Sequence, residues 1–233
     1  MIKSVKLYEY FRRAVSVVAP NRCPFCGDVI EAEKYYCEQC FEHLPFVEKE
    51  LSPPENVSRL IACCFYRSRA RKAVLQLKYG CLVYPADAFA LMISEKLSGI
   101  SADLIVPVPS SRASIRKRGF ATAELIGKTV SMRTGVPLAK ALGANRDKKE
   151  QKGLSAKNRL INAQSAFFLE SGFDLRGKTV VLLDDVCTTG ATLSACAKLL
   201  LDAGAEEVIA AVFAKTLSCG NIDLTRKKYR LRG

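Results

Sequence analysis

From about residue 58 onward, short apolar runs alternate with segments whose apolar positions recur every three or four residues. The runs predict buried strands and the recurrences predict helices. We predict strands at 60–66, 104–108, 166–169, 180–183 and 207–214, and helices at 70–78, 86–97, 119–133 and 193–203. Alternating strands and helices indicate an α/β fold with a mainly parallel sheet and flanking helices.

The first fifty residues follow a different pattern. Apolar residues from Leu7 to Val18 fall at helical spacing, which predicts an amphipathic helix ending at Pro20. The polar, proline-rich stretch Ser52–Asn56 is the predicted boundary. We therefore expect a small amino-terminal module at 1–50, an α/β domain at 58–220 and a basic tail at 221–233.

No apolar run reaches the roughly 18–20 residues that a bilayer span requires. Charged residues, among them Glu9, Arg12 and Arg13, interrupt any signal-peptide core near the amino terminus. We expect a cytoplasmic protein without a membrane span.

The most informative segment is 180–192, which reads VVLLDDVCTTGAT. Four apolar residues predict a strand buried on both faces, and the acids Asp184 and Asp185 fall where this strand is expected to end. The small, hydroxyl-bearing residues that follow lead into a helix, whose free N–H groups attract phosphate. Adjacent buried acids are costly without a partner, so a ligand carrying a phosphate and a diol fits better than a bare polar turn.

Positive charge is in excess, with a formal net charge of +13. Basic residues concentrate at 112–118, 146–159 and 226–232. Such an excess favours polyanions, which include nucleic acid and polyphosphorylated metabolites. Charge alone does not distinguish these two ligand classes. A basic face that is exposed to solvent and has no partner is a further alternative. Segment 146–159 has few apolar anchors, which is typical of a mobile loop that closes over a ligand.

Four of the ten cysteines form two Cys-x-x-Cys pairs, Cys23/Cys26 and Cys37/Cys40. Two thiolates from each of two turns complete a tetrahedral Zn²⁺ site, and four cysteines leave no open position for catalysis. A segment this short also has too little core to fold without a metal. A redox pair is the rival interpretation, but it needs no second pair nearby. We expect His43 to lie outside the site, and the other cysteines (Cys63, Cys64, Cys81, Cys196 and Cys219) to be buried.

Residues 172–179 match the Walker A pattern. That loop functions only when it follows a strand and opens a helix. Here the segment precedes the strand at 180–183, so we interpret Gly172 and Gly177 as turn residues.

The segment 180–192 resembles the phosphoribosyl-diphosphate (PRPP) signature of type I phosphoribosyltransferases. The resemblance implies that Asp184 and Asp185 engage the ribose hydroxyls as the catalytic acids. It implies further that the 5-phosphate is held by Thr188, Thr189, Gly190, Ala191 and Thr192, and the diphosphate, with Mg²⁺, by Pro109, Ser110, Arg112 and Arg118. Cys187 stands where the family usually has an aliphatic residue.

The whole chain is similar to the ComF family, on the four cysteines, Leu77-Lys78-Tyr79-Gly80, Val106–Pro109, Arg118-Gly119-Phe120, 151–162 and the signature. This resemblance implies a protein linked to competence for DNA uptake or to gluconate use, with PRPP or a related ribose phosphate as ligand. Single-stranded DNA and other competence proteins are the implied partners. Two functions stay open: phosphoribosyl transfer to an unknown acceptor, and a non-catalytic DNA-binding adaptor or PRPP-sensing regulator. Ala121-Thr122 replaces the family's frequent Asn-Gln, which puts the acceptor in doubt.

Overall fold

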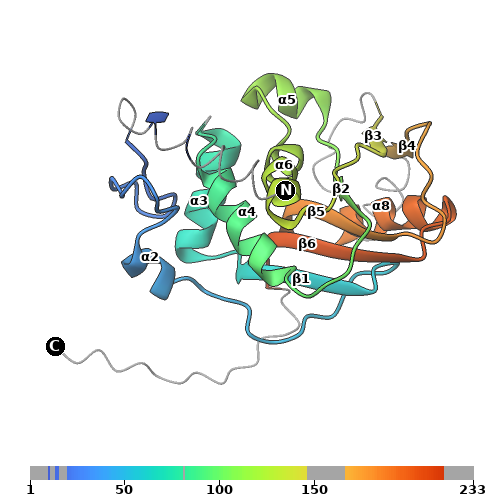
Figure 1. Ribbon diagram of the computed structural model, residues 1–233, viewed down its shortest axis with the longest axis horizontal. Coiled ribbons are helices and arrows are strands. Elements are labelled where there is room, and N and C mark those ends of the chain that lie inside the picture. Colours follow the sequence, from blue (N-terminus) through green and yellow to red (C-terminus); the bar gives the residue numbers. More distant parts are fainter. Residues whose placement is uncertain (1–9, 11–13, 16–19, 81, 146–165, 218–233) are drawn as a thin grey trace, which may run out of the picture.

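A computed structural model describes residues 10, 14–15, 20–80, 82–145 and 166–217 (Figure 1). At its centre lies a four-stranded sheet in the order β1-β6-β5-β2, and every neighbouring pair is parallel. The strands are β1 (Arg59–Phe65), β2 (Leu104–Pro107), β5 (Thr179–Cys187) and β6 (Glu207–Lys215). The predicted α/β fold with a parallel sheet is confirmed.

Helices cover both faces of this sheet (Figure 1). One face carries α3, α4 and α6, and the other carries α8. Their bounds are α3 (Ser68–Tyr79), α4 (Pro85–Lys96), α6 (Thr122–Thr134) and α8 (Ala191–Asp202). The predicted strands and helices of this domain thus occur close to their expected positions.

Alternation along β5 decides which face each of its side chains reaches. Val181 and Leu183 belong to the core beneath α4 and α6, whereas Val180 and Leu182 belong to the core beneath α8. All four are buried, as expected for a strand covered on both faces.

Three features differ from the sequence prediction. The acids Asp184 and Asp185 lie inside β5, which continues to Cys187, because the strand keeps pairing with β6 beyond them. A short helix, α5 (Arg112–Arg118), precedes α6, and Gly119 separates the two with φ +86°. The segment predicted at 166–169 forms β4 (Phe167–Leu169) of a separate antiparallel pair with β3 (Leu142–Ala144).

The amino-terminal module packs directly on the α/β domain. Its helix α2 (Glu38–Glu42) is followed by a segment that runs antiparallel to the edge strand β1. There the Val47 N–H donates to the Cys63 carbonyl at 3.0 Å. The module's Cys23, Phe25, Cys40 and Leu44 are buried in the same apolar core as α3 and α4.

Several predictions fall on segments that the structure does not describe. Most of the helix expected before Pro20 lies there, as do the basic segment at 146–159, the tail at 221–233, Cys81 and Cys219. The other cysteines expected to be buried, Cys63, Cys64 and Cys196, are buried. Among the described residues, no helix is both long and apolar enough to cross a bilayer.

The Walker-like segment has the predicted inverted context. Gly172 and Gly177 are turn residues with positive φ, and the chain then enters β5 at Thr179. No helix begins there to receive a nucleotide phosphate.

Candidate functional site

The four cysteines of the two Cys-x-x-Cys pairs come together in space. The Sγ atoms of Cys23, Cys26, Cys37 and Cys40 all lie within 4.8 Å of one another, and Cys26 Sγ lies 3.9 Å from Cys37 Sγ. Tetrahedral Zn–S bonds of about 2.3 Å place sulfur atoms about 3.8 Å apart, so the set fits a zinc ion. His43 is exposed, and its ring Nδ1 lies 2.8 Å from the Gln39 carbonyl oxygen, outside this cluster.

Backbone geometry prepares the cluster for metal binding. Gly27 adopts φ +96°, which closes the first turn and lets its N–H donate to the Cys23 carbonyl at 2.9 Å. Burial raises the pKa of the Cys23 thiol, but backbone N–H groups, that of Cys37 foremost, donate to the sulfur and leave the pKa lowered. The thiolate form, which binds zinc, is therefore favoured at Cys23, whereas burial raises the pKa of the Cys26 thiol to about 11 and also raises that of the Cys40 thiol.

Aromatic contacts fix the cluster to the α/β domain. Phe25, between the first two cysteines, is 1% exposed, and Tyr36 packs against the same core. The Arg133 guanidinium of α6 donates to the Tyr35 hydroxyl at 2.6 Å and lies 4.9 Å from the centre of that ring. Burial of Phe25 and Tyr36 against the domain is the arrangement expected of a structural zinc module.

A polar cleft of about 500 Å³ opens at the carboxyl ends of β2 and β5. In open parallel sheets this edge is where ligands bind. Residues of the helices α3, α5, α6 and α8, of the strands and of the loops between them line it: Tyr66, Leu75, Lys78, Tyr79, Val108, Pro109, Ser110, Arg118, Thr122, Ala123, Phe167, Asp184, Asp185, Val186, Thr188 and Thr192.

The cleft brings together most of the residues that the sequence singled out. Both acids line it, as do Pro109, Ser110 and Arg118 on one side and Thr188 and Thr192 on the other. Four candidates are not among its lining residues: Arg112, which is exposed at the start of α5, and Thr189, Gly190 and Ala191, which lie between Thr188 and Thr192 in the loop that leads into α8. Of the other cleft residues, the sequence analysis used Lys78 and Tyr79 only as part of the family resemblance, linked Thr122 only to the acceptor, and did not mention Tyr66 as a site residue.

The two acids face opposite sides of the sheet end because they are consecutive in a strand. Asp185 continues the series of Val181 and Leu183 and lies on the face of α3, where Lys78 Nζ contacts its Oδ1 at 2.7 Å. Asp184 continues the other series, toward α8, and its Oδ1 accepts the Asp185 backbone N–H at 2.8 Å. The two carboxylates therefore have different environments.

Among the residues that line the cleft, Asp184 has the most strongly shifted pKa. Burial, and then repulsion by the Asp185 carboxylate, raise its pKa to about 7, although the Lys78 ammonium opposes the rise. A carboxyl group with its pKa near neutrality, placed in a cleft beside a second carboxyl, is typical of a functional site.

The loop between β5 and α8 has the features of a phosphate cradle. Gly190 adopts φ +86° and immediately precedes α8; it offers no side-chain cap, although Thr189 Oγ1 accepts the Ala191 N–H at 3.4 Å. A Cβ at Gly190 would come within 2.7 Å of the Pro54 Cβ, so both its conformation and its packing require glycine. Lys215 Nζ donates to the Thr188 carbonyl at 2.6 Å, which anchors the start of the loop.

Across the cleft, two buried polar atoms lack a hydrogen-bond partner among the described residues. They are Arg118 Nε and Thr122 Oγ1, and Thr122 is only 3% exposed. Thr122 is the first residue of α6, whose N-terminus has no side-chain cap. Unsatisfied buried groups are rare in proteins, and here both belong to residues that line the cleft.

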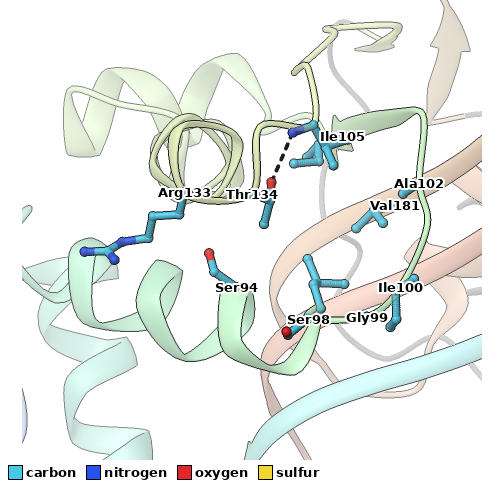
Figure 2. Close-up of a pocket in the computed structure, with 11 residues that line it drawn as sticks. Ser94, Ser98, Gly99, Ile100, Ala102, Ile105, Arg133, Thr134 and Val181 are labelled. Atoms are coloured by element: carbon cyan, nitrogen blue, oxygen red, sulfur yellow. Dashed lines mark hydrogen bonds between the residues drawn. The ribbon is translucent and has the colours of Figure 1, made fainter. Parts of the chain in front are cut away.

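A second cavity, of about 280 Å³, lies near the amino ends of β2 and β5, next to the carboxyl ends of α4 and α6 (Figure 2). Ser94 of α4, Ser98 in the turn after α4, Thr134 of α6 and Val181 of β5 surround it. Ser94 Oγ donates to the Ala90 carbonyl, and Thr134 Oγ1 donates to the Val130 carbonyl. No carboxylate lines this cavity, so the chemistry of the site concentrates in the polar cleft.

Comparison with known proteins agrees with this geometry. The family model described as phosphoribosyl transferase domain matches residues 93–228, and the one described as double zinc ribbon domain matches residues 14–52. Competence protein F of Haemophilus influenzae is 36% identical over 193 residues, which cover 80% of this chain and 81% of that protein. The chain belongs to the ComF family of phosphoribosyltransferase-domain proteins.

Two further relatives and one solved structure are similar to this chain. DNA utilization protein YhgH of Escherichia coli is 29% identical over 208 residues, covering 84% of this chain and 90% of that protein. Competence protein ComFC of Streptococcus pneumoniae is 33% identical over 122 residues, covering 52% of this chain and 51% of that protein. Among solved structures, adenine phosphoribosyltransferase from Leishmania tarentolae is 14% identical with a TM-score of 0.42, covering 72% of this chain and 94% of that one.

Proposed function

We propose that the polar cleft binds PRPP, or a closely related ribose phosphate, together with Mg²⁺. The observation that carries the proposal is a single cleft that holds the acid pair, Asp184 and Asp185, together with two groups of anion-binding donors. The first group is the loop that leads into α8, and the second is Arg118 and Thr122. PRPP has matching groups, a diol together with a 5-phosphate and a 1-diphosphate.

Each group in the cleft has a defined role in this proposal. The acid pair accepts hydrogen bonds from the ribose hydroxyls, and Thr188, Thr192 and the first N–H groups of α8 hold the 5-phosphate. Arg118 and the loop Pro109–Ser110 face the diphosphate. These roles extend the resemblance of the signature to the positions that line the cleft.

The cleft also fits Mg²⁺, which prefers oxygen ligands and binds through substrate phosphates beside one or two carboxylates. Most of its ligands would be the hydroxyl and diphosphate oxygens of PRPP, next to the negative acid pair. When bound, the ion neutralises charge on the diphosphate and makes it a better leaving group.

If the protein catalyses transfer, the bond between ribose C1 and the diphosphate oxygen breaks while an acceptor atom bonds to C1. The diphosphate leaves with the bonding electrons, and the acceptor loses its proton to solvent or to a cleft base. Positive charge develops on the ribose, so the protein contributes by positioning and by charge stabilisation. Thr122, at a position where the family often has glutamine, borders the space an acceptor would enter.

Calorimetric titration of the intact protein tests the proposal. We expect PRPP with Mg²⁺ to bind at least about tenfold more tightly than ribose 5-phosphate, because only PRPP reaches both groups of donors. Omitting Mg²⁺ should weaken PRPP more than it weakens ribose 5-phosphate. Equal affinities for the two ligands with and without Mg²⁺ would contradict binding across the acid pair. Adding bases one at a time to the PRPP complex then searches for the acceptor.

A second candidate function, binding of single-stranded DNA, is favoured by the short helix α5. It contains Arg112, Arg116, Lys117 and Arg118 and buries none of its residues. Beside it, Lys117 Nζ lies 5.4 Å from the centre of the Tyr79 ring, which is 63% exposed. Positive charge next to an exposed aromatic ring is the combination that single-stranded nucleic acid binds. Relatives named for competence and DNA utilization agree with this candidate.

Salt dependence tests the DNA candidate. We expect the affinity for a mixed-sequence single strand to fall steeply with salt and to vary little with sequence. The double variant Arg116→Ala/Lys117→Ala should reduce the salt slope by about 1.4, since each contact to a single strand contributes about 0.7. Lys198→Ala, on α8 at the opposite face, is the matched control and should leave the slope unchanged. An unchanged slope in the α5 variant would exclude α5 as the binding surface.

A further inference from the structure

We infer that Lys78 is a positioning residue for the acid pair: its ammonium group holds Asp185 in place and favours the ionised form of both carboxyl groups, which accepts the ribose hydroxyls. This inference rests on the proposed function, and it adds a residue from α3, far from the signature in sequence. Neither the apolar pattern nor the signature assigns Lys78 a role.

The contact between Lys78 and Asp185 is close and largely shielded from water. Lys78 Nζ lies 2.7 Å from Asp185 Oδ1, and the side chains are 25% and 5% exposed. Lys78 lies in the last turn of α3, which packs on the sheet face that Asp185 reaches. An ion pair this buried loses the hydration of both charges, so removing either partner leaves the other uncompensated.

The charges around the acids show why one cation matters so much. The groups acting on Asp184 are the Asp185 carboxylate, which opposes its ionisation, and Lys78 and Arg118, which favour it. From α8, the neighbouring group is the Cys196 thiol, whose own pKa is raised mainly by burial. Lys215 of β6 is committed to the carbonyls of Thr188 and Thr216. Among the residues that the structure describes, Lys78 is the cation that forms an ion pair with the acids.

The consequence concerns hydrogen bonding to the ligand. A ribose hydroxyl donates to a carboxylate, whereas a protonated carboxyl group acts as a donor itself and loses half of its acceptor capacity. Two carboxyl groups at one strand end repel each other, and one takes up a proton when no cation offsets the repulsion. Lys78 supplies part of that offset, and its contact at 2.7 Å holds the Asp185 carboxylate in place.

A double-mutant cycle with PRPP and Mg²⁺ tests the inference. Lys78→Met should weaken PRPP about tenfold or more near pH 7, and Asp185→Asn by a similar amount, while the double variant Lys78→Met/Asp185→Asn should lose little beyond either. Lys78→Arg, which keeps the charge, should restore most of the affinity. Inorganic phosphate, which needs only the phosphate loop, should bind all variants within about twofold of wild type.

The pH profile separates a charge effect from a loss of shape. In Lys78→Met the carboxyl groups hold protons to higher pH, so its PRPP affinity should rise steeply between about pH 7 and pH 9, whereas wild-type affinity should rise only about twofold there because the pKa of Asp184 is about 7. Additive losses in the cycle, or the same pH profile for Lys78→Met and wild type, would overturn the inference. If Lys78→Met does not fold, two comparisons still test the inference: Lys78→Met/Asp185→Asn against Asp185→Asn, and Lys78→Arg against wild type. Neither the double variant nor Lys78→Arg leaves an unpaired buried charge at the ion pair.

A measurement without ligand keeps this inference distinct from the proposed function. The melting temperature of Lys78→Met should fall more steeply than that of wild type from pH 5 to pH 8, because its folded state binds more protons. If wild type binds no PRPP while this steeper fall is seen, the proposed function fails and the charge role of Lys78 stands. If the two melting profiles coincide, the charge role is overturned whatever the ligand.

Discussion

The ring of Phe25 lies 6.5 Å from the ring of Phe213, with 24° between their planes. Phe25 belongs to the first zinc turn and Phe213 to the central strand β6, so the zinc module packs against the middle of the α/β domain. Phe89 of α4 stacks on Phe213 in turn. The module therefore contributes to the same apolar core that positions the cleft. Disrupting the packing of the module should destabilise the α/β domain as well.

Phe25→Ala should destabilise the whole protein. A fully buried phenylalanine replaced by alanine costs about 3–5 kcal/mol, through lost burial and a residual cavity. Phe173→Ala is the control, because Phe173 is 39% exposed in a surface turn and its loss should cost about 0.5 kcal/mol or less. Chemical denaturation checks both variants. A similarly small effect for Phe25→Ala would show that the module does not share the core.

Zinc removal should have the same global effect. The protein should contain about one zinc per chain, since four cysteines form one tetrahedral site. Cys37→Ser/Cys40→Ser should abolish zinc binding, while Cys63→Ser, which changes a cysteine outside the cluster, should retain it. Elemental analysis and thermal unfolding of each variant provide the measurement. A zinc-free wild type with an unchanged melting temperature would contradict a structural metal.

Stability should depend on pH through Asp184. Its folded pKa, about 7, lies above its ordinary value of 3.8, so the folded state binds the extra proton. Its contribution to stability is therefore complete below about pH 4 and is lost as the pH rises toward 7, by at most about 4 kcal/mol. Asp184→Asn should remove this part of the profile.

The control for the pH measurement is Asp174→Asn. Asp174 is exposed, and hydrogen bonds from Arg176 lower its pKa, so its small contribution has the opposite sign, appearing as the pH rises. Denaturation midpoints from pH 4 to pH 8 compare the two variants with wild type. A wild-type profile that Asp184→Asn leaves unaltered would place the titrating group elsewhere.

The sequence predicted the parallel sheet because four of its strands are apolar runs long enough to be recognised without context. It did not predict α5, because a helix that buries none of its residues has no apolar stripe. For a related reason the sequence predicted β4 but not its partner β3. The strand β3 contains only Leu142, Gly143 and Ala144, which is too short an apolar run to be recognised. The ends of elements are decided by tertiary pairing, which is how β5 came to extend past its acids.

The candidate site was predictable where the chemistry is local in sequence. The cysteine pairs and the loop from Thr188 to Thr192 each lie within a few residues, so spacing alone indicates their role. Lys78 and Thr122 reach the cleft only because α3 and α6 pack on the same face of the sheet, and periodicity does not report such packing. Arg112, close to Arg118 in sequence, points to solvent instead because it begins α5.

Comparing two ligands on one variant tests the central claim most directly. Titration calorimetry with Asp184→Asn/Asp185→Asn should show PRPP with Mg²⁺ weakened more than about tenfold, because both acceptors of the ribose diol lose their charge. Inorganic phosphate should bind within about twofold of wild type, because the Gly190 loop and the start of α8 are unchanged. Equal losses for the two ligands would show that the acids support the fold and do not recognise ribose.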